Sequence, residues 1–315
     1  MVATVFIDGE AGTTGLLIRE RLAGRIDMRL VSIDPDRRKD PAARRDCLNS
    51  VEVVVLCLPD EAARQAVGLI ENPQVRVIDA STAHRTAPQW VFGFPELAPG
   101  QKAAIGAAMR VSNPGCYATG FIALARPLVD AGLLPADALV TANAVSGYTG
   151  GGRAMIAEFE DPSSPDFTQV PFRTYSLGLN HKHVCEMQRH AGLDHPPLFA
   201  PAVGRFRQGM IVEIPVHLAA LAGRPKLDDL REVLAKAYAE APFVHVASKT
   251  ESEAVATLDI EQCNGTNLMR LHVFGSPDLG QARLAAVFDN LGKGASGAAV
   301  QNLNLMLGFD EVAGL

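Results

Sequence analysis

The first third of the chain alternates short apolar runs with segments whose apolar residues recur at helical spacing. Runs rich in β-branched residues predict strands, and Val51–Leu58 is continuous, as expected for a strand buried on both faces of a sheet. Strand and helix alternate in this way to about residue 110, which is typical of a doubly wound α/β domain. The predicted elements are the strands Val2–Ile7, Met28–Ile33, Val51–Leu58 and Val75–Ala80 and the helix Pro59–Ile70.

The remainder of the chain contains more predicted strands than helices, which indicates an α+β domain rather than a second doubly wound one. The last segment differs, because glycines and alanines crowd its start and Val300, Leu303 and Leu307 form one apolar helical face. We expect this helix to pack on the first domain. The other predicted elements are the helix Leu227–Ala241 and the strands Leu139–Val145, Met210–Leu221, Ala256–Ile260, Leu268–Phe274 and Ala282–Phe288.

The length of 315 residues fits two domains, and 48% of the residues are hydrophobic. We predict that residues 1–113 and 290–315 form one domain and residues 114–289 the other. The net charge of −6 argues against nucleic acid as a partner, and no apolar run approaches the roughly 18 residues of a membrane span. The five cysteines are scattered and suggest no disulfide framework, so a reducing cytoplasm is expected.

A glycine-rich turn follows the first predicted strand. Gly9, Gly12 and Gly15 form G-x-x-G-x-x-G, a departure from the commoner G-x-G-x-x-G, with Thr13 and Thr14 between the last two glycines. Glycines let the backbone turn tightly and approach a pyrophosphate, which then rests on the N-terminus of the next helix. Such turns are common, but this one opens a strand–helix–strand series, so we predict that it binds a dinucleotide.

The residues after the second strand bear on which dinucleotide is bound. An acid there would hydrogen-bond the ribose 2′-hydroxyl of NAD, whereas an arginine accommodates the 2′-phosphate of NADP. Asp34 favours NAD. Ser32 and the three consecutive cations Arg37, Arg38 and Lys39 favour NADP(H). A solvated loop of mixed charge is the alternative. We predict NADP(H).

The segment Val111–Gly120 is the best candidate for the seat of chemistry. Pro114 and Gly115 interrupt the chain just before an apolar run with helical spacing, so Cys116 is predicted to lie at the start of a helix. The helix dipole and the N–H groups there favour an anion, and a cysteine so placed can ionise near neutral pH to a nucleophilic thiolate. The alternative is a small buried residue at a loop–helix junction.

Other polar residues follow strands or glycine-rich loops. Arg85 lies shortly after the strand Val75–Ala80 and could clamp a phosphate or carboxylate, or be an ordinary loop arginine. The loop Ser146–Arg153 ends in a cation and could be a second anion-binding element or a flexible turn.

A histidine pair provides a candidate base. Asn180 is a reasonable N-cap, which would place His181 in the first helical turn, where the dipole keeps an imidazole neutral. His183 stands two positions later and would point to a different face of that helix, so we expect no shared metal site.

The chain resembles the N-acetyl-gamma-glutamyl-phosphate reductase family, in its shorter form, within the semialdehyde dehydrogenases. The resemblance is carried by Asn113-Pro114-Gly115-Cys116-Tyr117-x-Thr119, the Gly9–Gly15 turn, Ser81–Arg85, the loop Ser146–Arg153 and Gly292–Gln301. It implies a glyceraldehyde-3-phosphate-dehydrogenase-like fold, in which an N-terminal Rossmann domain is rejoined by a C-terminal helix after an inserted α+β catalytic domain. It also implies NADPH-dependent reduction in arginine biosynthesis, by a homo-oligomer that is a dimer or a tetramer.

The resemblance further implies roles for individual residues. Cys116 would form a thioacyl intermediate, and His181 matches the first histidine of the family's H-R-H-x-P-E segment, to which the acid/base role is assigned. Here that segment reads His181-Lys182-His183-Val184-Cys185-Glu186, and the two replacements leave the choice between His181 and His183 open. The predicted cofactor contacts, from the residues and the resemblance together, are Gly9, Gly12, Thr13, Thr14, Gly15, Ser32, Arg37, Arg38, Ser81, Asn290, Gly292 and Lys293. The predicted substrate contacts are Arg85, Asn113, Ser146, Gly147, Arg153, His183 and Glu186.

The expected reaction joins these parts. The thiolate would attack an acyl phosphate, phosphate would leave beside a cation, and hydride transfer would release a semialdehyde while the histidine supplies a proton. Three alternatives stay open at this point: an aspartate-semialdehyde dehydrogenase, a non-catalytic NADP-binding sensor and a Cys–His hydrolase. The hydrolase has no use for the glycine turn.

Overall fold

The computed structural model describes residues 2–37 and 40–315, and the chain divides into two compact units. The first contains residues up to Pro95, Gly100–Pro114 and Ala295–Leu315, and the second contains Glu96–Pro99 and Gly115–Gly294. Arg38, which was predicted to contact the cofactor, lies outside the described residues.

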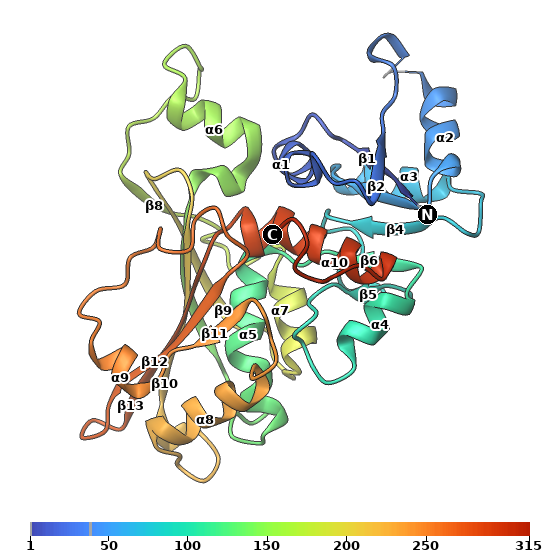
Figure 1. Cartoon of the computed structure of the whole chain (residues 1–315). Helices are drawn as coiled ribbons and strands as arrows, with labels where there is room; N and C mark the ends of the chain where they lie inside the picture. Colours follow the sequence, from blue (N-terminus) through green and yellow to red (C-terminus); the bar gives the residue numbers. More distant parts are fainter. Residues whose placement is uncertain (1, 38–39) are drawn as a thin grey trace. The chain divides into compact units, whose positions relative to one another are not determined.

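The first unit is built on a parallel six-stranded sheet with the order β2-β1-β3-β4-β6-β5 (Figure 1). β1 pairs with β2 on one side and with β3 on the other, so the strand order reverses there. In open α/β sheets, ligands bind beyond the carboxyl ends of the strands at such a reversal. The strands are β1 (Ala3–Asp8), β2 (Met28–Val31), β3 (Val53–Leu56), β4 (Arg76–Asp79), β5 (Val91–Phe92) and β6 (Arg110–Ser112).

Apolar side chains cover both faces of this sheet. Along β3, Val53 and Val55 join one core cluster, whereas Val54 and Leu56 join the other. The first cluster includes residues of α1 (Thr13–Leu22), α4 (Gln101–Ala107) and α10 (Gly297–Leu307), and the second includes residues of α2 (Pro41–Ser50) and α3 (Asp60–Gly68). Burial on both faces explains why β3 reads as an unbroken apolar run. A short 3-10 helix, η1 (Pro35–Arg37), follows β2.

The second unit is built on a mixed seven-stranded sheet with the order β11-β12-β13-β10-β7-β9-β8. Antiparallel pairs join β12, β13, β10 and β7, whereas β7 pairs with β9 in parallel. The strands are β7 (Thr141–Gly147), β8 (Phe172–Thr174), β9 (Leu198–Gly204), β10 (Met210–His217), β11 (Val244–Val246), β12 (Met269–Ser276) and β13 (Gln281–Phe288).

The helix α5 (Cys116–Asp130) is the centre of the second unit, since it packs against β10, β13, α7 and α8 (Figure 1). Most of its residues are buried. A Cβ atom at Gly120 would lie 2.7 Å from the Phe288 ring, so a glycine is needed for the helix to lie this close to the sheet. The other helices are η2 (Tyr148–Gly151), α6 (Gly152–Glu160), α7 (Val184–Ala191), η3 (Leu218–Ala220), α8 (Leu227–Ala237), α9 (Lys249–Glu253) and the π-helical turn η4 (Gly292–Ser296).

The predicted α/β fold class is confirmed, but four local predictions are wrong. Residues 256–260 form bends and a turn instead of a strand, and α8 ends at Ala237 instead of Ala241. The strand predicted at Met210–Leu221 ends at His217, where the 3-10 helix η3 follows. The helix after the histidine pair begins at Val184 with His183 as its N-cap, so Asn180 does not cap it and His181 precedes it.

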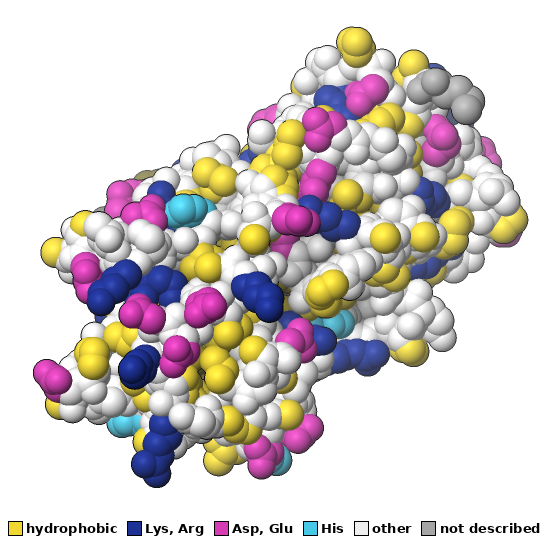
Figure 2. Space-filling model, turned by 60° about the horizontal axis from the view of Figure 1, so that its bottom comes forward, with side chains coloured by type: hydrophobic (Ala, Val, Ile, Leu, Met, Phe, Trp, Pro, Cys, Tyr) yellow, Lys and Arg dark blue, Asp and Glu magenta, His cyan; other side chains and the backbone are white. Residues whose placement is uncertain are grey.

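The surface has no strong segregation of charge on the face drawn in Figure 2, where acidic and basic side chains are interspersed with small apolar groups. Within the described residues, no helix is long and apolar enough to cross a membrane.

Candidate active site

The glycine turn of the first unit has the geometry of a pyrophosphate cradle. Gly9 has φ +94°, and a Cβ atom there would lie 2.3 Å from the carbonyl oxygen of Cys57. A Cβ atom at Gly15 would lie 2.4 Å from the carbonyl oxygen of Gly9. α1 begins at Thr13 without a side-chain cap at Gly12, so its first N–H groups have no capping side chain. These positions exclude side chains, and the helix N-terminus fits an anion.

The residues around the end of β2 are held by ion pairs and hydrogen bonds. The carboxylate of Glu10, within the turn, accepts a hydrogen bond from the hydroxyl of Ser32 at 3.0 Å and from Arg19 at 3.1 Å. The exposed guanidinium of Arg37 donates to Asp40 at 2.7 Å. Ser32 and Arg37 therefore lie at the surface of the first unit, each with a partner on that unit.

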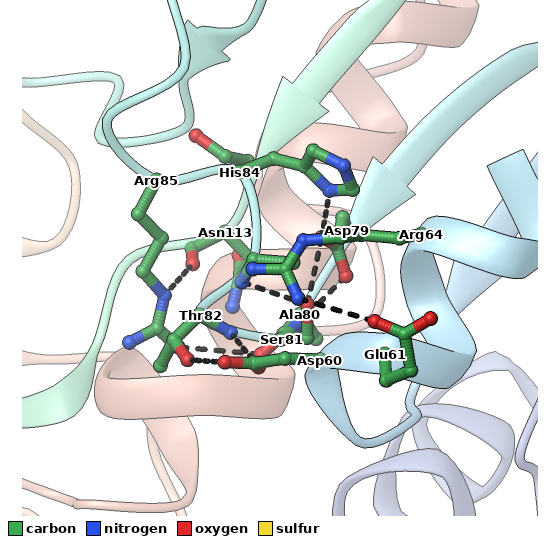
Figure 3. A network of polar contacts seen from close by, with 12 residues as sticks. Asp60, Glu61, Arg64, Asp79, Ala80, Ser81, Thr82, His84, Arg85 and Asn113 are labelled. Atoms are coloured by element: carbon green, nitrogen blue, oxygen red, sulfur yellow. Dashed lines mark hydrogen bonds and ion pairs between the residues drawn. The ribbon is translucent and has the colours of Figure 1, made fainter. Parts of the chain in front are cut away.

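A polar network surrounds Asp79 at the carboxyl end of β4 (Figure 3). This fully buried carboxylate accepts from the Ser81 N–H and hydroxyl and lies 2.6 Å from His84 Nδ1. The His84 ring stacks on Trp90. Arg85 donates to the carbonyl oxygens of Asn113 and Ala80, so part of its guanidinium holds the backbone that follows β4 and β6.

Asn113 links three segments of the first unit. Its Nδ2 donates to the carbonyl oxygen of Ala295, its Oδ1 accepts from Asn302, and its N–H donates to the carbonyl oxygen of Asp79. These bonds fix the end of β6 against β4 and α10. The side chain of Asn113, which was predicted to contact the substrate, thus already has structural partners within the first unit.

Cys116 is the first residue of α5, as predicted, and Gly115 is the N-cap. The buried carboxylate of Glu186 accepts the Gly115 N–H at 3.1 Å, which fixes the start of the helix. On the other side, a Cβ atom at Gly294 would lie 2.9 Å from the Cys116 Cβ. The half-buried Cys116 therefore follows a fixed helix start and has a glycine beside its Cβ.

Three of the other cysteines are poorer nucleophiles because burial disfavours their thiolates. Burial, with Asp79 and Asp8 nearby, raises the pKa of Cys57 to about 12. Burial also raises the pKa of Cys263 and of Cys47. The exposed Cys185 donates its thiol proton to the carbonyl oxygen of Lys182. Among these cysteines, Cys116 is the one that combines partial exposure with a position at the start of a long helix.

His181 lies against the side chain that follows the cysteine. Its ring packs edge-on against Tyr117, with centroids 5.7 Å apart. The His183 N–H donates to His181 Nδ1 at 3.1 Å, so the neutral ring carries its proton on Nε2, which lies 3.4 Å from the Tyr175 hydroxyl. The ring is thus held by local backbone instead of by a helix N-terminus.

His183 is a neighbour of this ring, contrary to the argument that the two histidines point apart. Because neither residue lies in regular helix, their ring centroids come within 4.7 Å. His183 Nε2 is 3.8 Å from Glu186, whose other carboxylate oxygen holds Gly115. Across the described residues, no group of three or more His, Cys, Asp or Glu side chains could hold a metal ion.

Two tyrosines contact the His181 ring, and sequence reasoning missed both roles. Burial raises the pKa of Tyr175 to about 12, and the nearby Cys116 adds to the rise. Burial raises the pKa of Tyr117 well above its usual value, with smaller contributions from Tyr175 and Cys116. Both hydroxyls are therefore protonated at neutral pH. Tyr117 is adjacent to the cysteine and could have been suspected, whereas no sequence signal marks Tyr175.

The loop after β7 is closely packed at its start. Ser146 is buried and donates to the carbonyl oxygen of Gly147, where a Cβ atom would lie 2.6 Å from the carbonyl oxygen of Arg207. Arg153, in contrast, is exposed in the first turn of α6. Of these three residues, Arg153 is the one that presents a charge to solvent.

The predicted cofactor contacts near the end of the second unit have partners inside that unit. Asn290 holds Gly209 and Thr149, and a Cβ atom at Gly292 would lie 2.1 Å from the carbonyl oxygen of Thr266. The ammonium of Lys293 donates to both carboxylate oxygens of Glu96, and its side chain has no exposed surface. The prediction of a cofactor contact by Lys293 does not fit this burial.

Two family models match the chain, each over the greater part of one unit. "Semialdehyde dehydrogenase, NAD binding domain" matches residues 13–105, and "Semialdehyde dehydrogenase, dimerisation domain" matches residues 116–290. Solved structures of similar fold include aspartate semialdehyde dehydrogenase II from Vibrio cholerae and a probable aspartate-semialdehyde dehydrogenase from Pseudomonas aeruginosa. Each has a TM-score of 0.74 at 16% identity and covers 98% of this chain, with 98% and 99% of the other chain covered. Fold and site thus define an oxidoreductase of the semialdehyde dehydrogenase class with a nicotinamide-cofactor domain.

Closer relatives narrow this class. The N-acetyl-gamma-glutamyl-phosphate reductase of Burkholderia lata is 55% identical, with 98% of both chains covered. That of Brucella ovis is 52% identical over 98% of this chain and 100% of its own. The chain belongs to the N-acetyl-gamma-glutamyl-phosphate reductase family, as the sequence motifs predicted.

Proposed function

We propose that the protein reduces N-acetyl-L-glutamyl 5-phosphate to N-acetyl-L-glutamate 5-semialdehyde with NADPH, a step of arginine biosynthesis, through a thioacyl intermediate on Cys116. The observation that supports it most directly is the arrangement around Cys116. The cysteine begins α5, Glu186 holds that helix start, and Tyr117, the residue after the cysteine, packs against His181. The substrate is inferred from the names of the relatives reported above, because the site residues alone do not specify it.

The first step is acyl transfer to sulfur. The Cys116 thiolate forms an S–C bond with the acyl carbon, and the C–O bond to phosphate breaks, so that phosphate leaves with the proton that the overall reaction consumes. The N-terminal N–H groups of α5 face the charge that develops on the acyl oxygen. Arg85 and Arg153 remain the proposed partners of the phosphate.

The second step converts the thioester to an aldehyde. A nicotinamide cofactor held by the glycine cradle would supply the hydride that the thioester carbon accepts. The C–S bond then breaks, the electron pair returns to sulfur, and the thiolate is regenerated without a further proton. We assign to His181 Nε2–H a hydrogen bond to the oxygen that is negatively charged before this collapse, because Nδ1 is occupied by the His183 N–H. This modifies the acid/base role expected from the sequence.

The proposed cofactor residues are those of the glycine cradle, Gly9, Gly12, Thr13, Thr14 and Gly15, with Ser81, two positions after the end of β4. For the choice of NADP(H), the support is Ser32 and Arg37 at the surface after β2, where a 2′-phosphate would meet a hydroxyl and a guanidinium. Asp34 accepts the N–H of Asp36 and is used locally. We expect a higher kcat/KM for NADPH than for NADH, and replacement of Arg37 by Glu is expected to reduce that ratio.

The central test is Cys116→Ser with its matched assay. The variant is expected to bind NADPH as the wild type does but to lose nearly all phosphate-dependent reduction of NADP by N-acetylglutamate semialdehyde. Turnover comparable to the wild type would contradict the thioacyl mechanism. A wild-type preference for aspartate semialdehyde over N-acetylglutamate semialdehyde would contradict the proposed substrate.

The second unit carries a dimerisation-domain match, and we propose that the protein is a homo-oligomer, either a dimer or a tetramer. Sedimentation equilibrium distinguishes these states. A monomer at micromolar concentration would contradict the proposal.

A further inference from the structure

A completely buried ion pair lies in the second unit. Lys293 Nζ is 2.7 and 2.9 Å from the two carboxylate oxygens of Glu96, and the side chains are 0% and 1% exposed. Nζ also lies 5.7 Å from the centre of the Phe243 ring. Burial, together with the charge of Glu96, raises the pKa of Tyr238, so that tyrosine is a neutral neighbour.

Such a buried ion pair contributes little net free energy to the stability of a fold. Removing two charges from water costs more than most buried pairs recover, and well-packed apolar residues of similar volume often stabilise a protein better. In contrast, the geometry of the pair is highly specific, because one ammonium is held by both oxygens of one carboxylate. A buried pair of this kind is therefore suited to fixing the position of the backbone that carries it.

The backbone that carries Lys293 lies beside the candidate nucleophile. Lys293 belongs to η4, and the next residue is Gly294, where a Cβ atom would lie 2.9 Å from the Cys116 Cβ. The Gly294 N–H donates to the carbonyl oxygen of Asp289, a residue that is itself fully buried. Glu96 comes from the short segment Glu96–Pro99, which joins the second unit although the residues before and after it belong to the first.

We propose that Glu96 and Lys293 are positioning residues, whose ion pair fixes the turn at Gly294 and so holds the Cys116 thiol in its reactive place. The pair touches neither substrate nor cofactor in this proposal, and it acts through the contact between Gly294 and Cys116. The inference rests on the proposed function only for its kinetic consequence, since the position of the thiol can be measured without substrate.

The test compares single and double replacements of the pair. Glu96→Gln keeps the shape of the side chain and removes its negative charge. Lys293→Met keeps most of the side-chain length and removes the positive charge. Either change leaves one buried charge without its counterion, so both a lower melting temperature and a lower activity are expected. The double variant Glu96→Leu/Lys293→Met removes both charges, and we expect it to regain most of the lost melting temperature.

The double variant separates positioning from stability. We expect its kcat for N-acetylglutamate semialdehyde to stay at least about tenfold below wild type while KM changes less, because a small displacement of the reacting group is enough for such a loss. The rate of Cys116 alkylation by iodoacetamide, followed by peptide mass spectrometry, is expected to differ at least about fivefold from wild type, because thiol reactivity follows local environment. The exposed Cys185 in the same sample is the internal control and should react at an unchanged rate.

A structural control is Leu271→Ala, a cavity variant in β12 that does not involve the pair. It should lower the melting temperature without changing the Cys116 alkylation rate. Recovery of kcat and of the alkylation rate together with melting temperature in the double variant would overturn the proposal. If wild type shows no activity on N-acetylglutamate semialdehyde, the proposed function fails, but the alkylation rates still decide the role of the pair.

Discussion

Adding one methyl group beside the nucleophile gives the sharpest test of the site. In Gly294→Ala the new Cβ would lie 2.9 Å from the Cys116 Cβ, 3.2 Å from the carbonyl oxygen of Asp289 and 3.4 Å from Phe288 Cε2. Carbon atoms normally approach to about 3.5–4.0 Å, so the methyl and the cysteine must separate by about 0.6–1.1 Å. Because neighbours lie on several sides of the methyl, the cysteine or the turn itself has to move.

The magnitude follows from that displacement. Overpacking of this kind costs about 1–3 kcal/mol of stability. Misplacement of a reacting group by about 1 Å can reduce the rate about 10²-fold, so we expect kcat to fall by about 10–100-fold. The KM for NADP should change little, since the glycine cradle lies in the first unit.

The assay measures kcat and the KM for each of N-acetylglutamate semialdehyde, phosphate and NADP. Gly68→Ala is the matched control, because a Cβ atom there meets nothing within 4 Å and lies in α3 of the first unit. That control should retain full activity. A kcat for Gly294→Ala within twofold of wild type would refute the argument that this glycine makes room for the cysteine.

Three further outcomes follow from other contacts. Gly15→Ala would place a Cβ atom 2.4 Å from the Gly9 carbonyl oxygen, so strain of about 1–3 kcal/mol should raise the NADPH dissociation constant about tenfold or more; an unchanged constant by titration would contradict the cradle. Tyr175→Phe removes the hydroxyl that contacts His181 Nε2, and a hydrogen bond worth about 0.5–1.5 kcal/mol predicts a loss of kcat of about two- to tenfold. Because the pKa of Tyr175 is about 12, the wild-type pH–rate profile below pH 10 should contain no step that this variant abolishes. The pKa of Glu251 is lowered from 4.5 to about 2 by hydrogen bonds from the Ser248 N–H, the Ser248 side chain and His245. A carboxylate whose pKa is lower in the folded state stabilises the fold at pH values above its pKa in the unfolded state. This contribution is lost as the pH falls from about 4.5 towards 2. The melting temperature of wild type should thus drop more steeply over that window than that of Glu251→Gln, and parallel curves would contradict the assignment.

The elements that sequence predicted best are those whose residues carry the pattern locally. The run at β3 is apolar throughout because both faces of the strand are covered. Cys116 begins a helix, as predicted, because Pro114 and Gly115 end the preceding segment and a helical apolar pattern follows. In contrast, residues 256–260 have the composition of a strand but form none, since a strand requires a partner with free hydrogen-bonding groups and not composition alone.

The residues around the nucleophile were predicted less well than the nucleophile itself. The histidine pair was placed on a helix from an apparent N-cap at Asn180, but the helix starts at Val184 and the rings come together through irregular backbone. Turn geometry of this kind depends on hydrogen bonds such as that from the His183 N–H to His181, which no periodicity reveals.

By itself, the sequence determined the strand–helix order of the first unit, the glycine cradle and the cysteine at a helix start, because each depends on neighbours within a few positions along the chain. Tertiary structure alone decided what surrounds that cysteine. Glu96 and Lys293 are 197 positions apart, and Gly115 and Glu186 are 71 apart, yet each pair is joined by hydrogen bonds. Contacts over such separations arise when packed elements bring their side chains together, and local sequence patterns do not encode which partners will meet.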